Sequence, residues 1–147
     1  MSTRANIELY DGWEEEKEIG KRMTWKKGVI LYHHCDGYPS WMGPELESRL
    51  KAARKELKKA GHPYWWDSER VGALIVKLSA NAGRLHRNVP TFQPCLDLHG
   101  DIEYLWRVFL GPKDGESEIR CFSVTWDWEK DQIKCLKEVD WRKEIES

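Results

Sequence analysis

The side chains best suited to chemistry gather in one short segment, residues 33–44, which reads HHCDGYPSWMGP. Its first part places His33 and His34 directly before Cys35 and Asp36. Imidazole and carboxylate groups can exchange protons or bind a metal ion, and a thiol beside an imidazole can act as a nucleophile. The same groups can also serve the fold, with Asp36 capping a turn and His34 bonding to the backbone. The segment is therefore the first candidate for a functional site.

The second part of the segment favours binding over catalysis. Tyr38 and Trp41 are aromatic, and Pro44 is expected to open a helix whose first N–H groups lack partners. Such a helix start carries a partial positive charge that suits an anion. We therefore expect a small soluble, non-catalytic binding or regulatory module that recognises a protein or a small anionic ligand. The candidate contacts are His33, His34, Asp36, Tyr38, Trp41, Trp65 and Trp66.

The alternative function is a metal-assisted hydrolase. His34 and Asp36 would act as an acid/base or metal-binding pair, joined by Asp97, His99 and Asp101 from a second predicted turn. This alternative requires the ends of two neighbouring strands to converge on one centre. The sequence has no HExxH or phosphate-binding motif, so no cofactor is predicted and a divalent metal belongs only to this alternative. A further hypothesis uses Cys35 as a thiol nucleophile.

A strand and a helix are expected to hold this segment. Residues 28–34 begin at a glycine and are rich in β-branched and aromatic side chains, which is typical of a strand. Residues 44–60 repeat apolar side chains at helical spacing, with Pro44 at the start and Gly61 just past the end. Asp36–Gly37 is typical of a turn, in which the glycine is free to adopt a positive φ angle. The functional groups are therefore expected at a strand–loop–helix junction.

Shorter signals predict the elements on either side of the junction. An apolar alternation at Ile7 and Leu9, followed by Asp11–Gly12, indicates a short strand and a turn. Residues 67–81 are amphipathic at helical spacing, with Asp67 as the N-cap and Gly83 beyond the end.

The last third of the chain predicts strands. After Pro90 they are expected over 91–98, 102–110 and 119–126, and a tight turn at His99–Gly100 makes them an antiparallel meander. The pattern of residues 127–147 leaves helix and strand open. The fold class is therefore α+β, with a small antiparallel sheet of about 4–5 strands and a helix pair packed on one face.

Length and charge limit the classes of protein further. A chain of 147 residues is expected to form a single domain over residues 1–147. Its 24 basic and 25 acidic residues give a net charge of -1, which argues against nucleic acid as the main partner. No apolar run is long enough to cross a membrane, and the first residues lack a secretory signal. The four cysteines form no CxxC pair, so we expect reduced thiols in the cytoplasm, and a homo-oligomer is compatible with the sequence.

The segment also resembles a known set of sequences. Residues 32–39, YHHCDGYP, followed by Gly43, are similar to a loop in uncharacterised prokaryotic and phage proteins with a His-x-Asp-Gly-Tyr-Pro motif. Those proteins often have an aromatic residue before the Asp, where this chain has Cys35. A Gly-Asp-Ile-Glu-Tyr segment, residues 100–104 here, is a second shared motif. The resemblance covers residues 29–110 and implies a shared domain, and it carries no activity to transfer.

Overall fold

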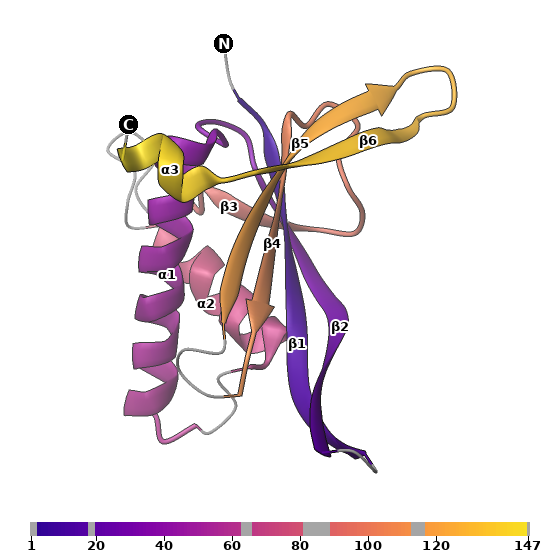
Figure 1. Ribbon diagram of the computed structural model, residues 1–147. Helices are drawn as coiled ribbons and strands as arrows, with labels where there is room; N and C mark the ends of the chain where they lie inside the picture. Colours follow the sequence, from indigo (N-terminus) through magenta and orange to yellow (C-terminus); the bar gives the residue numbers. More distant parts are fainter. Residues whose placement is uncertain (1–2, 18–19, 63–65, 81–88, 113–116, 147) are drawn as a thin grey trace.

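The computed structural model describes residues 3–17, 20–62, 66–80, 89–112 and 117–146. Within these parts a strand pair is followed by two helices, four strands and a short terminal helix (Figure 1). In chain order the elements are β1 (Ala5–Lys17), β2 (Gly20–His33), α1 (Pro39–Lys59), α2 (Ser68–Ser79), β3 (Phe92–Cys95), β4 (Tyr104–Leu110), β5 (Glu118–Asp127), β6 (Gln132–Val139) and α3 (Trp141–Glu146). None of the described helices is both long enough and apolar enough to cross a membrane.

The strands form one mixed 6-stranded sheet in the order β3-β2-β1-β4-β5-β6. β1 and β2 make a long antiparallel hairpin, whereas β1 and β4 run parallel, with Ala5 opposite Tyr104 and Asp11 opposite Leu110. β4, β5 and β6 form an antiparallel meander. The predicted α+β class is confirmed. The prediction of a small antiparallel sheet is wrong, because the sheet has more strands and its central pair is parallel.

The Asp-Gly pair at residues 11–12 lies inside β1 and makes no turn. The Asp11 carboxylate accepts hydrogen bonds from the backbone N–H (2.6 Å) and the hydroxyl (3.0 Å) of Ser68, at the start of α2. A Cβ atom at Gly12 would collide with the indole ring of Trp25. An Asp-Gly pair is typical of a turn, but here the contacts of Asp11 with Ser68 and of Gly12 with Trp25 account for the two residues.

The predicted hairpin at His99–Gly100 is also wrong. β3 and β4 do not pair, because β2 and β1 lie between them in the sheet. Residues 96–103 instead cross the sheet on the face opposite the long helices (Figure 1). The N–H of His99 donates to the side-chain oxygen of Asn6 (2.8 Å), and that of Glu103 donates to the carbonyl of Arg4 (2.9 Å). These bonds fasten the crossing segment to the first strand.

The first helix begins earlier than predicted, at Pro39, and Pro44 lies inside it. Pro39 suits the first helical position because its missing N–H would have no partner there. Pro44 lies on the exposed side of α1, where the carbonyl that loses its intrahelical partner can bond to water. α2 starts as predicted, with the Asp67 side chain accepting from two backbone N–H groups of the first turn. The predicted stop at Gly83 lies outside the described residues.

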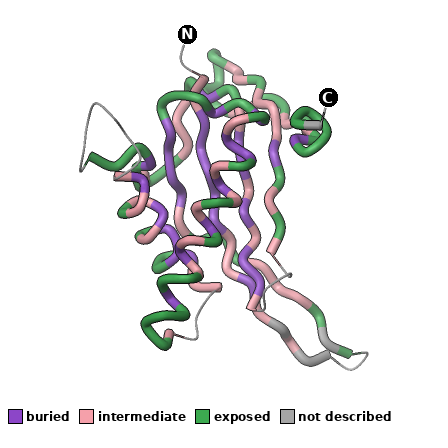
Figure 2. Tube along the Cα trace, turned by 90° about the vertical axis from the view of Figure 1, so that its left-hand side faces the viewer, coloured by how far each residue is buried: buried purple, intermediate pink, exposed green. Residues whose placement is uncertain are grey.

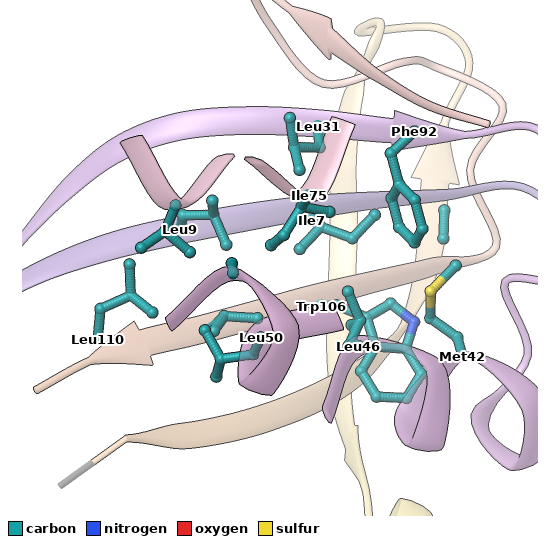
Figure 3. Close-up of a cluster of buried hydrophobic side chains, with 14 of the residues drawn as sticks. Ile7, Leu9, Leu31, Met42, Leu46, Leu50, Ile75, Phe92, Trp106 and Leu110 are labelled. Carbon is teal, nitrogen blue, oxygen red and sulfur yellow. The ribbon is translucent and has the colours of Figure 1, made fainter. Parts of the chain in front are cut away.

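Both long helices cover one face of the sheet and enclose the main hydrophobic core (Figures 1 and 2). Figure 3 shows Leu46 and Leu50 of α1 and Ile75 of α2 facing the strands. The predicted stripe of α1 is confirmed at its leucines and at Ala53, which are buried, while Ala60 is exposed at the C-cap. Each fully buried leucine or isoleucine contributes about 1.5–3 kcal/mol, and the cluster on this face has more buried members than the cluster on the opposite face.

The opposite face carries a smaller apolar cluster and a buried charge. Tyr32, Ile102 and Leu105 pack together where the crossing segment covers the sheet. Lower on this face the carboxylate of Glu8, only 2% exposed, lies 3.0 Å from Arg107 Nε and 3.1 Å from Lys27 Nζ. Burying a carboxylate this deeply is costly unless positive partners such as these offset its loss of hydration.

Candidate functional site

The 33–39 segment owes its shape to one strained residue and one close approach. Asp36 has a left-handed backbone (φ 54°), a conformation that Asp tolerates better than most residues. Gly37 was expected to hold the positive φ angle and does not. It is packed against β1, where a Cβ atom would lie 2.6 Å from Ala5 Cβ and 2.9 Å from the Thr3 carbonyl oxygen. Its own carbonyl accepts from Trp106 Nε1 (3.1 Å). The Asp-Gly pair is thus a structural feature of this junction.

His33, the last residue of β2, is buried beneath the start of α1. It is 6% exposed, and its ring lies 5.3 Å from the Trp41 ring and 4.6 Å from the Phe92 ring, between centroids. Nδ1 donates a hydrogen bond to the carbonyl of Cys35. A carbonyl can only accept, so this bond fixes the proton on Nδ1. Nε2 then carries a lone pair whenever the ring is neutral.

Burial lowers the pKa of His33 below its ordinary value. The hydrogen bond to the Cys35 carbonyl and the negative charges of Asp36 and Glu45 act in the opposite direction and only partly offset the burial. The ring is therefore neutral at pH 7, and Nε2 is an acceptor. The described residues give Nε2 no hydrogen-bond partner.

His34 turns to the other face of the sheet. Its Nδ1 lies 3.0 Å from the Tyr32 hydroxyl, and the Tyr32 ring stacks on the His99 ring at 3.7 Å between centroids. Burial, followed by the charge of Asp101, raises the pKa of Tyr32. The structure therefore brings His34 and His99 to one tyrosine, and the stacking of His99 on Tyr32 helps to hold the crossing segment on the sheet.

The carboxylates of the crossing segment have structural roles. Asp97 accepts from the N–H of Leu98 (2.8 Å), and Asp101 forms an ion pair with Arg4 (2.9 Å). Within the described ranges, no three His, Cys, Asp or Glu side chains lie close enough together to hold a metal ion. The convergence that the metal-assisted hydrolase requires is not seen among these residues.

A pocket of about 330 Å³ lies where the end of β2, the start of α1 and the residues before β3 meet, and we name it the junction pocket. It contains part of the predicted site together with residues that the sequence did not indicate. Its lining residues are His33, His34, Cys35, Asp36, Trp41, Glu45, Pro90, Thr91 and Gln93. None of the predicted metal-binding group at 97–101 belongs to this lining.

One of the missed residues, Glu45, could have been found from the sequence. Trp41 and Glu45 are one helical turn apart, so a helix that begins at Pro39 places both on the same side. Glu45 also pairs with Arg49 (2.8 Å). Residues 90–93 reach the pocket because β3 pairs with β2, with Phe92 opposite His33. That pairing joins segments far apart in the chain, and no local pattern indicates it.

Two other aromatic candidates, Tyr38 and Trp66, are not among the residues that line the pocket. Tyr38 is the N-cap residue of α1 and is 38% exposed, and Trp66 packs against the main core. Trp65 lies outside the described residues. Of the described aromatic candidates, Trp41 is the one in the junction pocket.

The predicted anion site is not at Pro44, because that residue lies within α1. At the true helix start Pro39 has no N–H, and the N–H groups of Trp41 and Met42 both donate to the carbonyl of Tyr38 (3.2 and 2.9 Å). Few free donors are left there for an anion.

A second hollow of about 430 Å³ lies between β5, β6 and α3. Its charged side chains pair with one another and with α1. Arg120 bonds to both carboxylate oxygens of Glu138 (2.8 and 3.1 Å), and Arg142 bonds to Glu47 (2.7 Å). Such paired charges offer little to a ligand, whereas the junction pocket has the Nε2 atom of His33, to which the described residues give no partner.

No family model matches the chain, and no curated protein or solved structure matches it. The resemblance to prokaryotic and phage proteins stays a prediction that rests on the two sequence motifs. The structure accounts for part of the first motif, because Gly37 and Gly43 both lie where a Cβ atom would collide with a neighbour.

Proposed function

We propose that this protein is a small, non-catalytic binding module whose ligand site is the junction pocket. One observation carries the proposal: a concave site of about 330 Å³ is lined by the imidazole of His33, an aromatic wall at Trp41 and polar side chains at its rim. Pockets of this size and mixed composition are typical of sites for compact ligands or for a single side chain of a partner.

The local hydrogen bonds favour binding over catalysis. The imidazole of His33 is held by the Cys35 carbonyl, and that of His34 is held by the Tyr32 hydroxyl. Each ring therefore has a fixed structural bond. A rigid pocket on a strand–helix junction suits recognition.

A ligand screen followed by amide NMR tests the proposal. We expect members of a small-fragment library to shift the amide signals of His33, Trp41 and Gln93 in the full chain. Thr91→Trp, at an exposed position of the pocket lining, should fill the site and abolish those shifts. Thr125→Trp places the same bulk at an exposed position in β5 and should leave them intact.

Two outcomes would count against the proposal. One is a library in which no compound shifts the signals of the pocket lining. The other is a set of shifts that persists unchanged in Thr91→Trp. Stabilisation by Mg²⁺, Mn²⁺ or Zn²⁺ that Asp36→Asn removes would instead support the metal-dependent alternative.

A further inference from the structure

The charge of the junction pocket is the first observation that defines its ligand. Two of the described lining residues are acidic, Asp36 and Glu45, and no lysine or arginine is among those that the structure describes there. Arg49 pairs with Glu45 from one turn further along α1 (2.8 Å) and partly offsets that charge. The described chain gives the Asp36 carboxylate no ion-pair partner. An anionic ligand would therefore meet an uncompensated negative charge at this site.

The second observation is independent of the acidic pair. His33 lines the pocket and is only 6% exposed. Its Nδ1 atom already donates a hydrogen bond to the Cys35 carbonyl. Nε2 has no hydrogen-bond partner among the described residues, and it is not one of their fully buried polar atoms. Because this nitrogen presents a lone pair, a group that bonds to it from the pocket must be a hydrogen-bond donor.

The third observation is the aromatic wall. Trp41 is half-buried, and its ring lies beside that of His33 at 5.3 Å between centroids. An indole face attracts cations more strongly than the other aromatic rings do. The acidic rim, the imidazole acceptor and the indole all favour the same chemical group, one that is positively charged and rich in N–H donors.

We infer that the junction pocket binds an ammonium or guanidinium group, with Asp36 and Glu45 supplying the opposite charge, Trp41 forming a wall and His33 Nε2 accepting a hydrogen bond. The inference rests on the proposed function and specifies its ligand. It replaces the small anion that the sequence predicts. The cation has two sources, a small amine or a lysine or arginine side chain of a partner protein.

The test compares ligands of one shape and different charge. The full chain is titrated at pH 7 with n-butylammonium, n-butylguanidinium, 1-butanol and butyrate at equal ionic strength, and binding is followed through the amide signals of the pocket. We expect both cations to bind, and the alcohol and the carboxylate to bind at least about fivefold more weakly. Equal binding of 1-butanol, or preference for butyrate, would overturn the inference.

A pair of matched variants assigns the charge to the pocket. Asp36→Asn removes the carboxylate and keeps a residue that tolerates the left-handed backbone. Asp131→Asn is the control, because Asp131 is the other described non-glycine residue with a positive φ angle (50°) and it is not part of the pocket. The first should weaken cation binding by about three- to fivefold and the second should not change it. Unchanged binding in both variants would overturn the assignment.

Further measurements distinguish the two sources of the cation. They also show whether a negative result contradicts the cationic ligand alone or the proposed binding function as well. Capped Gly-Lys-Gly and Gly-Arg-Gly peptides that bind about tenfold tighter than the free amines would indicate a partner protein, and weaker binding would indicate a small amine. Both results support the cation. If butyrate or the alcohol binds and Thr91→Trp blocks it, the binding module stands and the cation fails. If Thr91→Trp blocks none of the probes that bind, the proposed function fails as well.

Discussion

The indole ring of Trp141 lies on the backbone of Gly43, so close that a Cβ atom at residue 43 would overlap the ring. Trp141 Nε1 donates to the carbonyl of Ile119 (2.9 Å), and the ring is 4% exposed. One side chain of α3 therefore joins the first half of α1 to β5. The contact places the end of the described chain beside the helix that carries Trp41 and Glu45.

We expect Gly43→Ala to destabilise the protein. In an open helix this change adds about 1 kcal/mol of stability, because alanine is the better helix former. Here the methyl group must displace Trp141, and overpacking of this kind costs about 1–3 kcal/mol. Urea unfolding followed by circular dichroism measures the difference. A gain in stability would show that Trp141 does not pack on this glycine.

The buried carboxylate of Glu8 leads to a second prediction. Arg107→Met keeps the aliphatic stem but leaves Glu8 with Lys27 as its remaining cation in the described structure. Breaking a buried pair costs about 3–5 kcal/mol, and we expect somewhat less, about 2–3 kcal/mol, because Lys27 stays. The control is Arg120→Met, which breaks the exposed pair with Glu138 and should cost less than about 1 kcal/mol. Equal losses in the two variants would contradict this account.

The cysteines should differ sharply in reactivity. Cys35 and Cys135 are exposed, whereas Cys121 is fully buried and its burial raises the pKa of that thiol to about 12. Only the thiolate reacts readily, so alkylation at pH 8 should label the two exposed residues first and leave Cys121 unlabelled until the protein unfolds. Peptide mass mapping over time measures this order. Labelling of Cys121 at the rate of Cys35 would show that β5 is not packed as described.

The pH dependence of stability follows from the lowered pKa of His33. Below its ordinary pKa of 6.5, the unfolded chain takes up a proton that the folded chain resists. The unfolded state then binds more protons, so the free energy of unfolding decreases as the pH falls from 7 toward 5. His33→Gln keeps a donor for the Cys35 carbonyl and has no imidazole to titrate. Urea titrations across this range should give a smaller pH slope for the variant, and equal slopes would refute the assignment.

The sequence predicts those parts of the fold that depend on local periodicity. The stripe of Leu46, Leu50 and Leu57 identifies α1, and Asp67 marks the start of α2, because helix spacing and capping are read within a few residues. The helix start was misplaced because Pro39 and Pro44 both suit a first helical position, and no local signal distinguishes them. The first half of α1 also packs against residues distant in sequence, such as Trp141 on Gly43, and local patterns cannot indicate such contacts.

The site was predicted in part for the same reason. His33, Asp36 and Trp41 lie near one another in the chain, so the sequence could place them together. Thr91 and Gln93 reach the pocket only through the pairing of β3 with β2, which joins segments distant in sequence. The expected helix start at Pro44 would place a positive dipole beside the segment, whereas the folded chain starts the helix at Pro39 and places Glu45 in the lining of the pocket.

The parallel pairing of β1 with β4 has a consequence for how the chain is made. During synthesis the β1–β2 hairpin emerges first, and the partner of its open side, which begins at Tyr104, emerges only after both long helices. Until then the backbone groups of Ala5–Asp11 have no strand to bond to on that side, and they form an exposed sheet edge that can pair with other chains. The nascent protein is therefore most exposed to wrong association in the interval before its fourth strand leaves the ribosome.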